Sequence, residues 1–173
     1  MPLRVIRGMM GSEPDRARAL IELEDRIIER AAAGEEKRVT KSELEKRYEV
    51  PGEVIDRLAE LGVLTPNSRG YSQSDARIVE AISRFRAGGY DERIGFTVYD
   101  TLRYKSALEG LVKEEVEVLL DRLTREMDAQ RAVDMVEAGA EPLHDLISAL
   151  HSKLLVAELQ RAREDGRRNG RRP

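Results

Sequence analysis

The chain has 173 residues, of which 40% are hydrophobic and 36% charged, and it contains neither Cys nor Trp. This length allows one domain or two small ones with a buried core, and the lack of Cys excludes disulfides, thiolate zinc sites and a cysteine nucleophile. The formal charge of −3 argues against a non-specific nucleic-acid coat, which needs a strong positive excess. Because no apolar run approaches a membrane span or a signal-peptide core, we expect a cytoplasmic protein with no membrane partner. We also expect no cofactor.

The segment between Ser12 and Gly34 has the periodicity of a helix. Ser12, two residues before Pro14, marks a helix start, and apolar residues then recur every three or four positions until Gly34. We assign residues 1–38 to an N-terminal helical segment. Together with Leu3–Arg7, this segment has two interpretations. It is either the end of an additional unit of the same kind as the unit that follows residue 38, or an ordinary helix that packs against that following unit.

Two short helices and an extended stretch are expected next. Thr40 and Glu43 have the pattern of a capping box at the start of the first helix, which Val50–Gly52 interrupts after about two turns. The second helix ends at Gly62, and an extended stretch leads to the turn residues Asn67–Gly70. This order predicts a helix-turn-helix followed by a small wing, an arrangement that delivers a helix into the major groove of DNA.

Long helices are expected after this unit. Ser72 or Ser74 caps one helix, and Thr97 opens another whose apolar stripe lasts about 30 residues. Gly139–Pro142 breaks the pattern before a final helix, which gives way to an arginine-rich end.

The predicted fold is therefore all-α, with a winged helix-turn-helix unit flanked by an N-terminal helix and a C-terminal helical hairpin. After the N-terminal segment, the winged unit occupies residues 39–95. Long helices for dimerisation or effector binding occupy residues 96–160, and a flexible basic tail occupies residues 161–173.

The segment from Glu49 to Pro66 resembles, without gaps, the second helix and exit of MerR-type transcriptional regulators, whose usual form is Gly-Val-Ser-x-Arg-Thr-Ile-Arg-Tyr-Tyr-Glu-x-x-Gly-Leu-Leu-x-Pro. The resemblance resumes at Tyr71–Asp75, which is similar to the family's Tyr-Ser-x-x-Asp-Leu helix, and it continues to Tyr90. It implies a transcriptional regulator that binds double-stranded DNA as a homodimer. In that family a coiled coil holds two winged units apart, and distortion of the promoter controls transcription.

The expected DNA-reading helix departs from the family pattern. Glu53 and Asp56 stand where the family places arginines, and a carboxylate is repelled by phosphate. Between Val39 and Tyr90 the charges balance, with eight basic and eight acidic residues. The alternative function is a winged-helix module that keeps this shape for protein interaction or small-ligand sensing and does not bind DNA.

Four cations are the candidates for contacts with DNA phosphates, and solvated surface charge is the competing explanation for each. They are Lys41, Arg47, Arg57 and Arg69. Six further arginines in the tail outnumber its two acids. Such a tail holds either a DNA backbone or an acidic partner, or it simply keeps the protein soluble.

A cluster of aromatic residues surrounds the turn after residue 88. These residues line an effector pocket or pack between helices: Tyr90, Phe96, Tyr99 and Tyr104. Glu141 and His144 have the Glu-x-x-His spacing of di-metal bundles, but one copy does not make a site, so we predict no metal. The chain shows no motif of a known catalytic frame, and we expect no enzyme activity.

Overall fold

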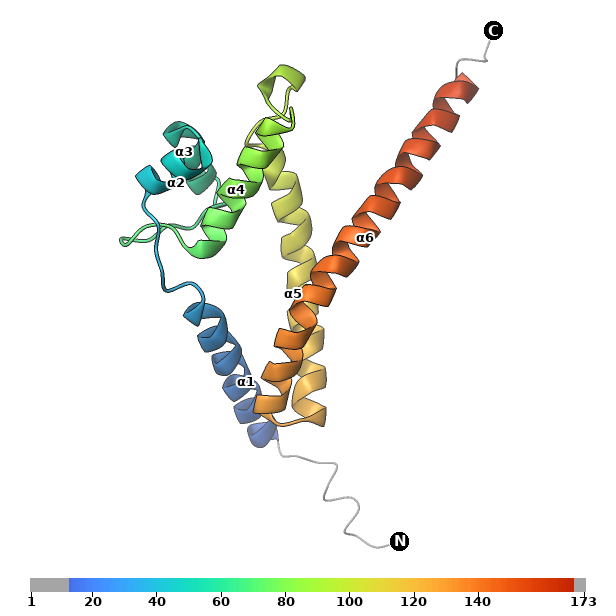
Figure 1. The fold of residues 1–173 in the computed structure, drawn as a ribbon. Coiled ribbons are helices and arrows are strands. Elements are labelled where there is room, and N and C mark those ends of the chain that lie inside the picture. Colours follow the sequence, from blue (N-terminus) through green and yellow to red (C-terminus); the bar gives the residue numbers. More distant parts are fainter. Residues whose placement is uncertain (1–12, 170–173) are drawn as a thin grey trace, which may run out of the picture. The chain divides into compact units, whose positions relative to one another are not determined.

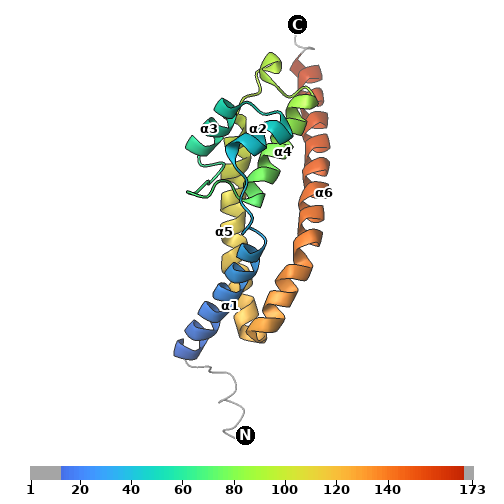
Figure 2. The ribbon, with the colours of Figure 1, turned by 60° about the vertical axis from the view of Figure 1, so that its left-hand side comes forward.

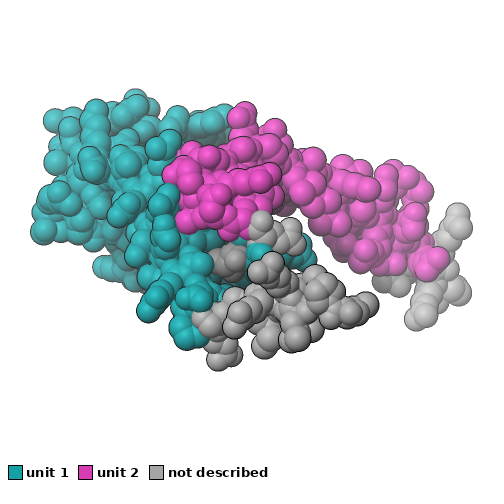
Figure 3. Space-filling model, turned by 90° about the horizontal axis from the view of Figure 1, so that it is seen from below, with its two compact units in different colours: residues 1–126 teal, residues 127–173 magenta. Residues whose placement is uncertain are grey.

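The computed structural model describes residues 13–169, which are all-α (Figure 1 and Figure 2). In chain order the helices are α1 (Glu13–Ala33), α2 (Lys41–Tyr48), α3 (Gly52–Glu60), α4 (Gln73–Ala87), the short 3-10 helix η1 (Glu92–Ile94), α5 (Asp100–Glu126) and α6 (Ala129–Asn169). The predicted all-α class is confirmed for this part of the chain. Two compact units are present, residues 1–126 and 127–173 (Figure 3).

The core of the first unit lies among α2, α3 and α4. Ile55 and Leu58 are three positions apart on α3, and Ala76 and Val79 are three apart on α4, so each pair lies on one helix face. Burying these faces together is what stabilises three helices that are too short to persist alone. The buried cluster consists of Leu44, Val50, Ile55, Leu58, Leu64, Tyr71, Ala76 and Val79.

Two capping boxes fix where α2 and α4 begin. The Thr40 hydroxyl accepts a hydrogen bond from the Glu43 amide at 3.2 Å, and the Glu43 carboxylate accepts one from the Thr40 amide at 2.7 Å. Ser72, one of the two serines expected at this place, makes the same exchange with Asp75. The buried Asp75 carboxylate also accepts from the Thr65 amide at 3.0 Å, which ties the chain after α3 to the start of α4.

The predicted wing is wrong as a β hairpin, because the described residues contain no β strand. Asn67 and Gly70 exchange two backbone hydrogen bonds of 3.0 Å, and Val39 and Tyr71 exchange two of 2.9 Å. Both are isolated bridges. The next pair that would bond across the turn, Thr65 and Ser72, does not extend the ladder, because both amides donate to the Asp75 carboxylate instead.

The helix α1 packs along α5, as both ribbon views show. Leu23 of α1 and Leu123 of α5 are buried, and Arg16 forms an ion pair with Asp121. The end of α1 before Gly34 agrees with the prediction. The expected cap at Ser12 and the segment 3–7 lie outside the described residues.

The second unit is the single helix α6, and the predicted break at Gly139–Pro142 is wrong. The chain leaves helical geometry at residues 127–128 instead, and α6 then runs through Pro142. Pro142 removes one backbone hydrogen bond, but the residues around it are mainly Ala, Leu and Glu, which favour helix strongly. The same helix continues through residues 161–169, where a flexible tail was expected.

Candidate functional site

The outer face of α3 is exposed and mostly acidic. Glu53, Asp56 and Glu60 are exposed there, together with Arg57. The N-terminal helix α1 packs along α5 and does not cover this face of α3. The helix after Pro51 is therefore presented to solvent, as a reading helix has to be.

Two of the four predicted phosphate contacts, Lys41 and Arg57, are paired with carboxylates of α3. The Nζ atom of Lys41 lies 2.5 Å from Oδ2 of Asp56, and this hydrogen bond raises the pKa of Lys41. The Nη1 atom of Arg57 lies 2.6 Å from Oε2 of Glu60. The hydrogen bond to Glu60 is also the main reason why the pKa of Arg57 is raised. Their positive charges are thus matched within the protein.

The other two predicted cations, Arg47 and Arg69, are differently placed. The Arg47 guanidinium lies over the Tyr48 ring, with 5.3 Å between its Cζ atom and the ring centroid. Arg69 is exposed in the turn before α4, where its backbone amide donates to Oδ1 of Asn67 at 2.9 Å. Within residues 13–169 neither side chain has an ion-pair partner within 4 Å. They remain able to contact an anion from outside.

An open apolar groove of about 1010 Å³ lies along α4 and α5 and reaches Val54 of α3. Three of the four predicted aromatic residues line it, namely Tyr90, Phe96 and Tyr104. Tyr99 does not line the groove; its hydroxyl accepts a hydrogen bond from Nε of Arg57 at 3.0 Å, and its ring lies under that guanidinium. The structure therefore separates Tyr99 from the other three.

Phe85 of α4 also lines the groove. It is 44% exposed and stacks on Phe96, with 5.9 Å between ring centroids and planes 9° apart. Tyr90 meets both rings edge-on, at 5.2 and 5.9 Å. The three rings form one apolar wall, which the sequence pattern of α4 alone does not reveal.

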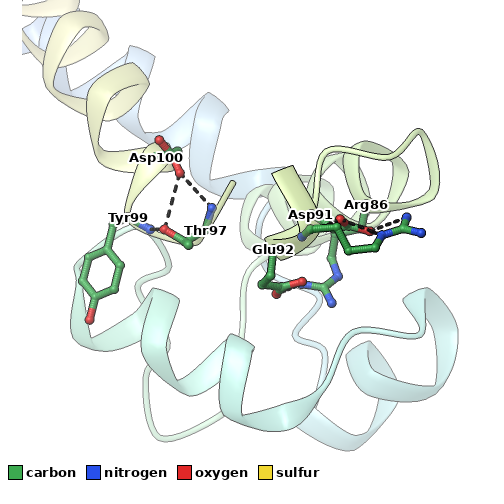
Figure 4. Close-up of polar contacts among 7 residues, drawn as sticks. Arg86, Asp91, Glu92, Thr97, Tyr99 and Asp100 are labelled. Carbon is green, nitrogen blue, oxygen red and sulfur yellow. Dashed lines mark hydrogen bonds and ion pairs between the residues drawn. The ribbon is translucent and has the colours of Figure 1, made fainter. Parts of the chain in front are cut away.

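Polar contacts fix the loop that carries these rings (Figure 4). Arg86 and Glu92 form an ion pair of 2.6 Å, and the Asp91 side chain caps η1. The Asp100 carboxylate accepts a hydrogen bond from the Thr97 amide at 2.7 Å. Because both ends of the loop are held, the aromatic wall is positioned by the fold rather than by a ligand.

A second hollow, of about 390 Å³, lies beside α2, and none of the sequence patterns above predicts it. A charge count that starts at Val39 leaves out Lys37 and Arg38. The sequence signal for this hollow is the presence of two basic dipeptides, Lys37–Arg38 and Lys46–Arg47, at either end of the predicted first short helix. The hollow is lined by Lys37, Arg38, Val39, Glu43, Lys46, Arg47 and Gln73.

No protein-family model, curated protein or solved structure matches this chain. Within the described residues, no three His, Asp or Glu side chains gather closely enough to hold a metal ion. Glu141 and His144 are exposed on α6. In the same part of the chain, no helix combines the length and the apolar composition that crossing a membrane requires.

Proposed function

We propose that this chain is a transcriptional regulator that resembles the MerR type and binds double-stranded DNA as a homodimer. The observation that carries the proposal is the pair α2 and α3, two short helices joined by residues 49–51 over a shared core, with the outer face of α3 exposed. The turn between them includes Glu49 in a left-handed conformation, with φ of 53°. Helix pairs of this kind place the second helix in the major groove.

The acidic face of α3 makes phosphate binding depend on cations elsewhere. Lys41 and Arg57 already pair with carboxylates, so Arg47 and Arg69 are the cations that we assign to the DNA backbone. Of the base edges, the α3 carboxylates accept hydrogen bonds only from the amino group of cytosine. The proposal therefore predicts weak affinity for DNA in general and a preference for cytosine opposite α3.

A titration of duplex DNA over a range of salt concentrations tests this assignment. The affinity falls steeply with salt, because each phosphate contact releases counterions. Arg47→Ala and Arg69→Ala each remove one phosphate contact from both copies of the homodimer, so each should weaken binding and reduce the salt slope by about two. Arg84→Ala, which removes an exposed cation of α4 outside both hollows, leaves affinity and slope unchanged. A wild-type chain that fails to bind any duplex at low salt contradicts the proposal.

The homodimer of this proposal forms through α5. Tyr104, Leu108, Val112 and Val116 recur every four residues along the groove, and each is 46–50% exposed. An apolar stripe of this length on a helix needs a covering partner. A second copy of α5 supplies one of the same length and composition.

The charges beside this stripe are self-complementary. Lys105, Glu109, Lys113 and Glu117 alternate in sign at four-residue intervals along the groove, and Lys105 and Glu109 also form an ion pair within one chain. When two copies of α5 cross antiparallel about a centre at Leu111, Lys105 of each copy lies opposite Glu117 of the other, and Glu109 lies opposite Lys113. A two-fold interface requires such reciprocal pairs, so the pattern favours this register.

A second candidate function is a regulatory module that binds an apolar ligand without binding DNA. The acidic face of α3 favours it, and so does the groove, whose volume is at the upper end of the range for small-molecule sites. An apolar fluorescent probe tests it, because Phe96→Ala removes part of the aromatic wall and should weaken probe binding. Tyr48→Phe, outside the groove, is the control. Binding of the probe without binding of any duplex favours this candidate.

A further inference from the structure

The hollow beside α2 is surrounded by positive charge. Lys46 and Arg47 lie three and four positions after Glu43 and therefore on the same face of α2. Lys37 and Arg38 come from the segment that leads into this helix. None of these four cations has an ion-pair partner within 4 Å in the part of the chain that the structure describes. Four cations thus face one carboxylate around a cavity of about 390 Å³.

The segment that carries two of these cations is held by the fold. The Gln73 side chain donates a hydrogen bond to the backbone oxygen of Lys37 at 2.8 Å. The next residue but one, Val39, exchanges two backbone hydrogen bonds of 2.9 Å with Tyr71. The backbone at Arg38 is therefore fixed between two anchor points, so binding an anion does not have to order it.

Arg38 has an unmet hydrogen-bonding requirement. Its Nε atom is buried and has no hydrogen-bond partner among the described residues. A buried N–H without an acceptor is rare in folded proteins and unfavourable, and a bound acceptor relieves it. The guanidinium groups of Arg38 and Arg47 are planar donors whose paired N–H groups match the oxygens of a phosphate.

Glu43 sets a limit on the ligand. Its Oε2 atom accepts hydrogen bonds from the amide and the hydroxyl of Thr40, each at 2.7 Å. These bonds, the backbone one first, lower the pKa of Glu43, so it keeps its charge at neutral pH. The cations still outnumber it, but its repulsion weakens the binding of any anion, and the preference for a group with several oxygen acceptors over a halide ion comes from the paired N–H groups of Arg38 and Arg47.

We propose that this hollow binds a phosphate group, held mainly by Arg38 and Arg47 with Lys37 and Lys46 around it. The phosphate belongs either to a nucleic-acid backbone or to a small phosphate ester. The site lies on α2 and the segment before it, not on α3, so it does not depend on DNA reading by α3, and it shares only Arg47 with the proposed DNA contacts.

Titration of the full chain with inorganic phosphate, followed by backbone amide NMR shifts, tests the site. Sodium chloride at equal ionic strength is the reference. Phosphate should shift the amides of residues 37–39 and 46–47. Arg38→Gln and Arg47→Gln should each weaken phosphate binding about tenfold. Arg38→Lys, which keeps the charge but loses Nε–H, should weaken it less.

Two further variants keep this test decisive. Glu43→Gln retains the capping box and removes the repulsion, so phosphate should bind several-fold more tightly. Arg84→Gln removes one exposed cation outside the hollow and should change nothing. Shifts that chloride reproduces, or equal losses for Arg38→Gln and Arg84→Gln, overturn the proposal. Circular dichroism of each variant separates lost binding from lost folding.

A parallel titration with a duplex of mixed sequence distinguishes the two sources of phosphate. Arg38→Gln is the variant that decides, because Arg47 is assigned to the DNA backbone in either case. If Arg38→Gln weakens duplex binding as it weakens phosphate binding, the site takes a backbone phosphate. If phosphate binds and the duplex does not, the site serves a small phosphate ester, and the DNA-binding proposal fails while this one stands.

Discussion

Glu35 joins the end of α1 to the start of α4 through a single carboxylate. Its two oxygens accept hydrogen bonds from the Ser74 amide at 2.9 Å and the Ser74 hydroxyl at 2.6 Å, and Arg77 lies 3.2 Å away. The hydroxyl bond, followed by the amide bond, lowers the pKa of Glu35 from 4.5 to about 2. Because the pKa is lower in the folded chain, this contribution to stability is present above pH 4.5 and is lost as pH falls toward 2.

Glu35→Gln is therefore expected to lower the free energy of unfolding by about 1–2 kcal/mol at neutral pH, as the loss of hydrogen bonds to a charged group does. Urea unfolding followed by circular dichroism measures this. The difference from wild type should shrink as the pH approaches the pKa of Glu35, about 2. Glu36→Gln, an exposed neighbour, is the control. A difference that is the same at all pH values would contradict the role given to this carboxylate.

Gly70 closes the turn against the backbone of residue 39. Its φ is +110°, and a Cβ atom added there would lie 2.6 Å from the Val39 carbonyl oxygen, which belongs to the bridge with Tyr71. Gly70→Ala should lower the free energy of unfolding by about 1–3 kcal/mol. Gly62→Ala is the matched control, because Gly62 has φ of +66° with open space around it and bears only the backbone strain. The free energy of unfolding of both variants is measured with urea. Equal losses for Gly70→Ala and Gly62→Ala would contradict the close contact between residue 70 and the Val39 carbonyl.

At the scale of elements, α6 balances one unfavourable residue against many favourable ones. A proline inside a helix costs about 3 kcal/mol relative to alanine. Pro142→Ala should therefore stabilise the middle of α6 by up to that amount and slow amide hydrogen exchange in residues 138–146. Glu141→Ala replaces one good helix former by another and should change exchange little. If the wild-type amides just after Pro142 exchange without protection, the helix is interrupted there.

The local elements could be predicted from sequence, and the tertiary pairings could not. The capping box at Thr40 and the apolar spacing of α3 depend on residues within one turn, so their positions follow from the sequence. The pairing of Lys41 with Asp56 joins residues 15 apart, and that of Arg57 with Tyr99 joins residues 42 apart. These contacts change which cations can reach a phosphate, and no local pattern encodes them.

At the scale of the whole molecule, the first unit leaves several large apolar side chains exposed. The exposed side chains are concentrated on α5, where Leu108 and Val112 lie at the middle of the groove. Within residues 13–169 neither Lys113 nor Glu117 has an ion-pair partner within 4 Å. Both the apolar stripe and these charges are explained together when a second α5 lies across the groove.

Charge reversal tests that arrangement directly. In Lys113→Glu dimers, Glu109 of each copy faces a carboxylate of the other, and in Glu109→Lys dimers two ammonium groups face each other. Each variant alone should weaken self-association about tenfold in sedimentation equilibrium. An equimolar mixture of the two should restore it, because every opposed pair then has opposite signs. Glu114→Lys, which changes an exposed residue outside the groove, is the control. A mixture that associates no better than its components would exclude the antiparallel register centred on Leu111.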